Sequence, residues 1–221
     1  MKAMILAAGR GERLRPLTNT IPKPLIKIGE HCLIEWHLLN LAQAGINDVV
    51  INVSWLAEQI QDTLGDGRVY GVNITYSIEP EQALETGGGI FQAMTFFQGE
   101  AFLVVNGDIW TDYSFSRIKS LGKQAHLVMV ANPPHHPEGD FILNKSILSD
   151  AGDGKRATYS GIGIYHPDFF SGCHAGRFPL APLMLSAMQQ HQVTGEYYQG
   201  CWVDVGTQDR LQLARDMAAE V

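Results

Sequence analysis

The sequence is poor in cysteine, short of positive charge and free of long apolar runs, and each shortage excludes a class of protein. Its three cysteines, Cys32, Cys173 and Cys201, are widely spaced, so we expect neither a disulfide framework nor a paired metal-ligand motif. The 16 lysines and arginines are outnumbered by 23 aspartates and glutamates, and the net charge of −7 argues against non-specific binding to nucleic acid. No apolar run approaches the roughly 20 residues that span a bilayer.

These shortages predict a setting and a set of partners. Few, scattered cysteines suit a reducing compartment, and the apolar stretch at residues 1–8 is too short for a signal peptide. We therefore expect a cytoplasmic protein that binds neither nucleic acid nor membrane. An anionic small molecule is a compatible substrate if a few cations are concentrated in one pocket. A monomer and a dimer fit the sequence equally well.

Apolar runs alternate with helical patterns in the first half of the chain. Strands are predicted at residues 3–8, 48–53, 72–78 and 101–106, and helices between them at residues 32–45, 55–65 and 86–97. This alternation predicts a largely parallel sheet with right-handed crossovers. The second half is richer in strands, at residues 126–132, 140–144, 157–166 and 197–206, with helices at residues 180–191 and 207–220.

The two halves together predict one domain over residues 1–221. It is expected to be an α/β domain of Rossmann-like architecture. Its central sheet should be mixed but mostly parallel, and flanked by helices.

The chain lacks the two most familiar phosphate-binding loops. A dinucleotide-binding fingerprint would need glycine where Leu14 stands and a helix that starts inside the motif, but Pro16, Pro22 and Pro24 follow early. No GxxxxGK[ST] stretch exists either. A nicotinamide-dependent oxidoreductase is therefore disfavoured.

What the chain has instead is a glycine-rich loop, LAAGRGERLRPLT, at residues 6–18 after the first predicted strand. Gly9 and Gly11 would let backbone N–H groups approach a polyphosphate closely. Arg13 could bind phosphate oxygens in a bidentate manner, and Lys23, between two prolines, offers a fixed point charge. The alternative is an ordinary surface loop with solvated cations.

Two aspartates stand beside predicted strands. Asp108, in VNGD, follows a buried strand at the edge where open α/β sheets bind ligands. Asp204, in WVDVG, lies between two valines, where an unpaired carboxylate would be costly. Two such carboxylates suit a hard divalent cation such as Mg²⁺. Taken alone, Asp108 could equally be a turn residue that accepts hydrogen bonds from local backbone N–H groups.

The succession GxGxRxxPxT, PKP, VNGD and WVDVGT resembles the sugar-1-phosphate nucleotidyltransferases over essentially the whole chain. LETGGGI, NGDIWTDY and GDF, supported by GEYYQGCWVDVGT, resemble the uridylyltransferases of bacterial cell-wall recycling, the recycling of peptidoglycan. The resemblance implies the nucleotide-diphospho-sugar transferase fold. It also implies a Mg²⁺-dependent enzyme that condenses UTP with N-acetylmuramate 1-phosphate to give a UDP-sugar and pyrophosphate. Because the chain stops at Val221, we expect it to lack the C-terminal β-helix of bifunctional relatives.

The same resemblance implies roles for particular residues. The catalytic set would be Arg13, Lys23, Asp108 and Asp204, with the two aspartates holding the metal. The nucleotide would be bound by Ala8, Gly9, Gly11, Glu12, Arg13, Lys23, Glu79 and Asn106, and Glu79 would accept from the uracil N3–H. The sugar phosphate would be bound by Glu85, Gly88, Gly139, Asp140 and Trp202.

Further expectations concern the walls of these sites and the choice of sugar. Ala7 and the loop at residues 79–88 would enclose the base. His135 and His136 either form a wall of the sugar site or lie on the surface, and Lys155 or Arg156 could supply positive charge. The alternative substrates are glucose, mannose or N-acetylglucosamine 1-phosphate. An alternative of another class is a non-catalytic module that binds nucleotide sugars.

Overall fold

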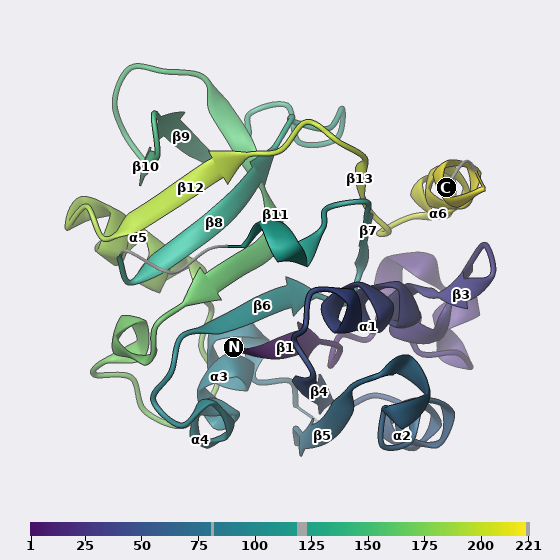
Figure 1. The fold of residues 1–221 in the computed structure, drawn as a ribbon. Helices are drawn as coiled ribbons and strands as arrows, with labels where there is room; N and C mark the ends of the chain where they lie inside the picture. The colour runs from purple at the N-terminus through teal and green to yellow at the C-terminus, as the bar shows by residue number, and fades with distance from the viewer. Residues whose placement is uncertain (81, 119–122, 220–221) are drawn as a thin grey trace.

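The fold is built around one large sheet. The computed structural model describes residues 1–80, 82–118 and 123–219, and within these residues nine strands pair in the order β5-β4-β1-β6-β11-β8-β12-β10-β9 (Figure 1). Their bounds, in that order, are Asn73–Ile78, Asp48–Val53, Lys2–Leu6, Phe102–Asn106, Arg156–Tyr165, Ala125–Val130, Val193–Tyr197, Ile147–Ser149 and Phe141–Asn144. The sheet is mixed, as predicted.

The prediction that this sheet is mostly parallel is wrong, because it holds for one side only. β5, β4, β1 and β6 are parallel to one another, and β12 is parallel to β8. In contrast, β11 is antiparallel to β6, β8 and β9, and β10 is antiparallel to β9 and β12. The strand–helix alternation ends at β6, and short connections without a helix can join only antiparallel neighbours.

The prediction of one strand over residues 197–206 is wrong for most of its length: only Tyr197 and residues 202–204 are in strands, and these strands belong to two different sheets. β12 ends at Tyr197 in the large sheet. β13 (Trp202–Asp204) pairs instead with β7 (Ile109–Thr111) in a separate two-stranded sheet. A second small sheet joins β2 (Lys27–Ile28) to β3 (His31–Cys32). The β7–β13 pair is the part that matters for the site, because each of these strands adjoins or carries one of the two predicted metal ligands.

Helices cover both faces of the large sheet. They are α1 (Leu33–Gln43), α2 (Ala57–Leu64), α3 (Glu85–Gln92), α4 (Met94–Phe97), α5 (Ala181–Gln189) and α6 (Gln208–Ala218). The helix predicted at residues 86–97 is interrupted at Ala93. Short 3-10 helices lie at Glu12–Leu14, Leu17–Asn19, Lys23–Leu25, Arg68–Tyr70, Phe115–Arg117 and Pro167–Phe170. No helix of the described residues is long and apolar enough to cross a membrane.

Successive residues of β1 point into different cores. Ala3 and Ile5 pack in a cluster with apolar residues of α1 and α2, whereas Met4 packs on the other face in a cluster with α3, α4 and α5. Each buried Ile or Leu of these clusters contributes about 1.5–3 kcal/mol by leaving water. A third cluster, which includes Leu14 and Leu211, packs α6 near the end of the glycine-rich loop.

The site follows from the ends of three parallel strands. Carboxyl ends of parallel neighbours meet at one edge of a sheet, and ligands bind outside that edge. In this sheet Leu6 of β1 is paired with Asn52 of β4 on one side and with Asn106 of β6 on the other. The glycine-rich loop, Asn52 and the Asn106–Asp108 turn therefore lie together.

Candidate active site

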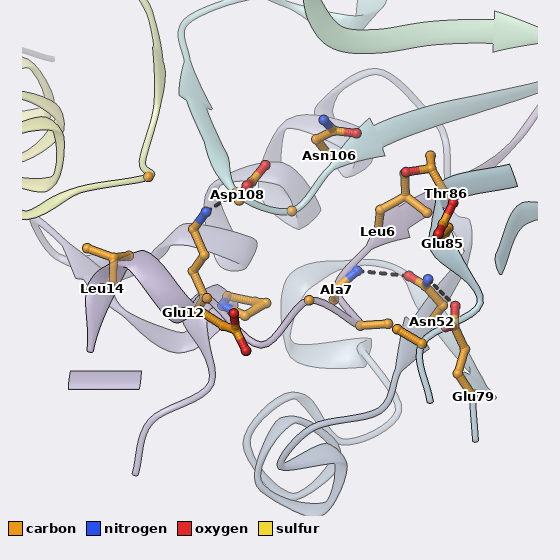
Figure 2. A pocket seen from close by; sticks show the side chains of 18 of the residues that line it. Leu6, Ala7, Glu12, Leu14, Asn52, Glu79, Glu85, Thr86, Asn106 and Asp108 are labelled. Carbon is orange, nitrogen blue, oxygen red and sulfur yellow. Dashed lines mark hydrogen bonds and ion pairs between the residues drawn. The ribbon is translucent and has the colours of Figure 1, made fainter. Parts of the chain in front are cut away.

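A cavity of about 460 Å³ opens at the carboxyl ends of β1, β4 and β6 (Figure 2). It is lined by Leu6, Ala7, Ala8, Gly9, Gly11, Glu12, Arg13, Leu14, Lys23, Pro24, Asn52, Glu79, Ala83, Glu85, Thr86, Asn106, Gly107, Asp108 and Gly206. A second cavity of about 350 Å³ is lined by Asn106, Asp108, Ile109, Pro133, His135, His136, Thr158, Tyr159, Ser160, Trp202 and Asp204. The two cavities adjoin each other, because Asn106 and Asp108 belong to both.

Most of the predicted site residues line one of these cavities. All the residues predicted to bind the nucleotide line the first cavity, and Trp202 and Asp204 line the second. His135 and His136, which the sequence left open, line the second cavity as well. The structure thus brings together segments that are nearly 200 residues apart in sequence.

Four residues predicted for the sugar phosphate are placed differently. Glu85 lines the first cavity, where Arg177 Nη2 lies 2.8 Å from its carboxylate. Gly88, Gly139 and Asp140 are not among the lining residues of either cavity. Gly88 is buried in α3, and its N–H donates to the Phe178 carbonyl oxygen at 3.0 Å.

The side chain of Asp140 contacts two residues that line the second cavity, Tyr159 and His136. It accepts a hydrogen bond from the Tyr159 N–H at 2.8 Å, and His136 Nε2 lies 3.1 Å from its other oxygen. Arg156 donates to the carbonyl oxygens of Asp140 and Asp150, so its guanidinium is held by the backbone instead of facing a sugar. Lys155 is exposed and outside both linings.

The glycine-rich loop is bent into a tight turn at Gly11. This residue has φ of +63°, in the left-handed region that favours glycine. Its carbonyl oxygen accepts from Thr18 Oγ1 at 2.8 Å, and a Cβ at this position would lie only 2.9 Å from Thr18 Cγ2. The turn leads into Leu14, which is buried, while Arg13 stays exposed at the cavity.

Arg10 is exposed, and its side chain packs against an aromatic ring. Its guanidinium carbon lies 5.1 Å from the centroid of the Trp55 ring. Such a cation–π contact at an exposed site contributes about 0.5–1 kcal/mol. Arg10 and Arg13 belong to the same loop, but only Arg13 lines the first cavity.

The two predicted metal ligands lie on neighbouring backbone segments, and each is paired with a cation. The Val205 N–H donates to the Asp108 carbonyl oxygen at 2.8 Å, which continues the β7–β13 pairing. Lys23 Nζ lies 2.6 Å from Asp108 Oδ2, as the dashed line in Figure 2 marks. Arg210 Nη1 lies 2.7 Å from both carboxylate oxygens of Asp204.

Arg210 was not singled out in the sequence, although it is one of the best placed cations. The Thr207 hydroxyl caps the start of α6 by accepting from the Arg210 N–H, which fixes Arg210 in the first helical turn, facing back toward Asp204. His135 Nε2 lies 3.1 Å from Asp204 Oδ1 and also contacts Arg210 Nη1. A basic residue in a helical pattern reads as solvated surface, so no local signal marks this role.

The donor atoms of Asp108 and Asp204 suit a hard cation. Both are carboxylates, and Mg²⁺ in nucleotide sites usually takes one or two carboxylates and completes its shell with phosphate oxygens and water. No group of three or more His, Cys, Asp or Glu side chains that could hold a metal occurs in residues 1–80, 82–118 and 123–219. A metal held here would therefore depend on substrate for part of its coordination.

Beneath Asp108 lies a buried histidine of α1. His37 Nε2 is 2.9 Å from the carbonyl oxygen of Ile109, the first residue of β7. Burial lowers the His37 pKa to about 4, although the Ile109 carbonyl and the Asp108 charge oppose the shift. The ring is therefore neutral at pH 7 and donates its Nε2–H to the carbonyl, which ties α1 to the turn that carries Asp108.

The opposite end of the first cavity contains a chain of hydrogen bonds. The Ala7 N–H donates to Asn52 Oδ1 at 2.8 Å, and Asn52 Nδ2 donates to Glu79 Oε1 at 2.6 Å (Figure 2). Glu79 Oε2 accepts from the Leu84 N–H at 3.0 Å. Glu79 was predicted as a base-binding residue, but Asn52 was missed because it lies within an apolar strand pattern.

Comparisons with known proteins fit this geometry. Residues 2–141 match the family model described as Nucleotidyl transferase. The chain is 51% identical over 227 residues to an N-acetylmuramate alpha-1-phosphate uridylyltransferase of Neisseria meningitidis, covering 99% of this chain and 98% of that protein. It is 31% identical to a protein of the same name from Caulobacter vibrioides, covering 99% and 97%. The structure of a putative glucose-1-phosphate thymidylyltransferase from Bacillus anthracis superimposes with a TM-score of 0.87 at 22% identity, covering 100% and 96%, and has the same α/β fold.

Proposed function

The chain belongs to the nucleotidyl transferase family, and we propose from this premise that it transfers a uridylyl group from UTP to N-acetylmuramate 1-phosphate. The observation that carries the proposal is the match to the Neisseria meningitidis relative over nearly the full length of both chains. The products are UDP-N-acetylmuramate and pyrophosphate, and the reaction serves the recycling of cell-wall sugars. The domain extent of 1–221 and the cytoplasmic location stay predictions.

The two adjoining cavities support a direct transfer between two bound substrates. The nucleotide would occupy the first cavity and the sugar phosphate the second, with Asp108 and Asn106 between them. An oxygen of the sugar phosphate attacks the α-phosphorus of UTP, a new P–O bond forms, and the bond to the β-phosphate oxygen breaks. No covalent intermediate is required, so the work of the protein is positioning and neutralisation of charge.

The cations of the site divide this work between them. Arg13, exposed at the first cavity, would contact the phosphates that leave as pyrophosphate. Lys23 is only 7% exposed, so its ammonium is held at the cavity wall. Substrate phosphate would compete with Asp108 for that ammonium, and we assign Lys23 to the α-phosphate.

Asp108 and Asp204 would hold Mg²⁺. The metal, when bound, would neutralise phosphate charge at the reacting centre. Arg210 would keep the Asp204 carboxylate oriented through its 2.7 Å contacts. Near Asp108 the same support comes from the His37 hydrogen bond to Ile109.

The choice of sugar depends on the second cavity. N-acetylmuramate carries a lactyl carboxylate, which must be paired with a donor or a cation when it is removed from water. Because His135 and His136 line the second cavity and Arg156 lines neither, we assign the two histidines to this carboxylate, each through the ring nitrogen that does not contact Asp204 or Asp140. Trp202 would provide the apolar side of the same cavity, since its indole N–H already donates to the Ser160 carbonyl oxygen.

The test is pyrophosphate release across a panel of nucleotides and sugar phosphates. We expect kcat/KM to be highest for UTP with N-acetylmuramate 1-phosphate, ahead of N-acetylglucosamine 1-phosphate and glucose 1-phosphate. If glucose or mannose 1-phosphate is used best with UTP, the sugar assignment fails while the nucleotidyl transfer stands. If no pair releases pyrophosphate, the chain is a binding module and the enzymatic proposal fails.

A further inference from the structure

Asn52 is a polar residue in a place where the fold needs only apolar ones. It lies near the end of β4, between Ile51 and Val53, which are fully buried, and it is itself only 3% exposed. Burying an amide in such surroundings is unfavourable unless its hydrogen bonds are made. An apolar side chain at this position would avoid this cost, so the amide points to a task that packing does not require.

That task is visible in its partners. The backbone N–H of Ala7 can only donate, and the carboxylate of Glu79 accepts, so the amide oxygen must face Ala7 and the amide nitrogen must face Glu79. The orientation of Asn52 is thereby determined without ambiguity. Through it, the start of the glycine-rich loop and the residue that follows β5 are held to one another at the cavity wall.

Glu79 is held from a second side as well. Its Oε2 accepts from the Leu84 N–H, so each carboxylate oxygen has one neutral donor. Gly89 of α3 packs directly on the pair: a Cβ there would lie 2.9 Å from Asn52 Nδ2 and would overlap with Glu79 Oε1. The carboxylate is 5% exposed and therefore has one fixed position at the wall of the cavity.

A carboxylate held in this way can still accept further hydrogen bonds from the cavity. Its two oxygens have about four lone-pair positions, of which the residues that the structure describes use one on each oxygen. A cavity wall that offers hydrogen-bond acceptors favours a base with a ring N–H, such as the N3–H of uracil. It disfavours cytosine, whose N3 carries a lone pair and would face the carboxylate without a proton between them.

We propose that Asn52 is a positioning residue for base selection: it holds the Glu79 carboxylate so that the inner end of the first cavity takes a pyrimidine that offers a ring N–H at N3. The inference rests on the proposed function, because it assumes that a nucleoside triphosphate occupies this cavity. It adds a residue whose side chain acts through Glu79. Asn52 determines which pyrimidine is used, and the chemical step is left to the other end of the cavity.

The test compares UTP with CTP as substrates of wild type, Asn52→Asp and Asn52→Leu between pH 6 and 8.5. Wild type should prefer UTP by about 10- to 100-fold in kcat/KM, the range expected for one unpaired buried polar group. In Asn52→Asp, a carboxyl oxygen replaces the donor that lies 2.6 Å from Glu79. At pH 6 the two carboxyl groups share one proton and keep the contact; as the pH rises they lose it and repel each other.

The UTP preference of Asn52→Asp should therefore fall toward 1 as the pH rises, mainly through KM for UTP, whereas that of wild type stays constant. The Asn52→Leu variant should lack the preference for UTP over CTP at every pH. Because the preference is a ratio, it does not depend on the fraction of variant that folds. The matched control is Asn73→Asp: Asn73 Nδ2 also donates to a carboxylate, Asp48 at 3.1 Å, but at an exposed position outside both cavity linings.

An unchanged UTP-to-CTP ratio in both Asn52 variants, or an equal loss in Asn73→Asp, would overturn the inference. So would a wild type that prefers CTP. A wild type that releases no pyrophosphate with N-acetylmuramate 1-phosphate would count against the proposed function alone. The inference is then tested by calorimetric binding of UTP and CTP to the same four proteins, where the same change of ratio is expected.

Discussion

The two ends of the first cavity are held together by different kinds of interaction (Figure 2). At one end a partly exposed ion pair joins Lys23 to Asp108, whose side chain is 41% exposed. At the other end Glu79 is buried and accepts hydrogen bonds from the neutral donors of Asn52 and Leu84. A partly exposed ion pair contributes about 0–1 kcal/mol, so an incoming phosphate can replace Asp108 as the partner of Lys23. A buried hydrogen bond costs about 1–3 kcal/mol when its partner is lost, so the neutral end keeps its geometry.

This difference separates chemistry from recognition. The charged end, with Asp204 and Arg210 adjoining it, is suited to exchange its internal ion pairs for metal and phosphate. The neutral end is suited to select a base by hydrogen bonds to acceptors in fixed positions. Substitutions at the charged end should therefore lower turnover with little effect on base preference, and those at the neutral end should do the reverse.

The largest expected effect comes from removing charge at the metal ligands. We predict that Asp108→Asn and Asp204→Asn each lower kcat by about 100- to 1,000-fold, because a neutral amide cannot balance the charge of a metal at the reacting phosphate. The unfolding midpoint should stay near that of wild type, since both side chains are partly exposed and asparagine keeps their shape. Steady-state pyrophosphate release measures the first quantity, and thermal denaturation the second.

The same pair of variants tests whether the two ends are separate. The residual activity of Asp108→Asn should still prefer UTP over CTP to the wild-type degree. EDTA should reduce wild type to the level of the variants, and Mg²⁺ should raise the thermal midpoint of wild type but not of the double variant. Near-normal turnover of both single variants in Mg²⁺ would rule out the metal assignment.

The sequence pointed to some residues of each end and missed others, and the reason is physical. Phosphate and metal ligands are grouped in short motifs, so Gly11, Arg13 and Asp108 could be recognised from their neighbours in the chain. The neutral end depends on a pairing between strands and on the backbone N–H groups of Ala7 and Leu84, which carry no sequence signal. Asn52 becomes conspicuous only when its burial is known.

The fold divides in the same way. The parallel strands β1, β4, β5 and β6 were predicted because they alternate with helical patterns along the chain. The stretch at residues 197–206 was predicted as one strand because its residues have strand propensity throughout. Its division between β12 and β13 depends on the availability of β7 as a partner, which is a property of the assembled fold.

A smaller effect is expected within the glycine-rich loop. We predict that Arg13→Ala lowers kcat/KM for UTP by about 10- to 100-fold, because it removes one charge-assisted contact to the departing phosphates. Arg10→Ala removes the same charge from the same loop but only a contact with the Trp55 ring, so it should cost less than about fivefold. The comparison of the two alanine variants by initial rates separates phosphate binding from general loop charge. Equal, small effects would mean that this segment is an ordinary surface turn.

The smallest effect concerns a neutral group that supports the charged end. The His37 pKa is lowered from 6.5 to about 4 by burial, so the unfolded chain binds a proton more readily than the folded one between these values. The free energy of unfolding should therefore decrease as the pH falls through this window. The linkage amounts to about 1.4 kcal/mol for each pH unit, or about 2 kcal/mol between pH 6.5 and pH 5.

His37→Gln tests this because an amide can still donate to the Ile109 carbonyl but does not titrate in this range. We expect the variant to be somewhat less stable than wild type at pH 7 and to lose less stability on acidification. The difference between the two urea-unfolding curves at pH 7 and pH 5 isolates His37, since the other histidines are present in both proteins. If both proteins lose the same free energy between these pH values, the ring is not held neutral in the folded state. In that case the loss of unfolding free energy on acidification would come from other groups, and the His37 hydrogen bond to the Ile109 carbonyl would not contribute to it.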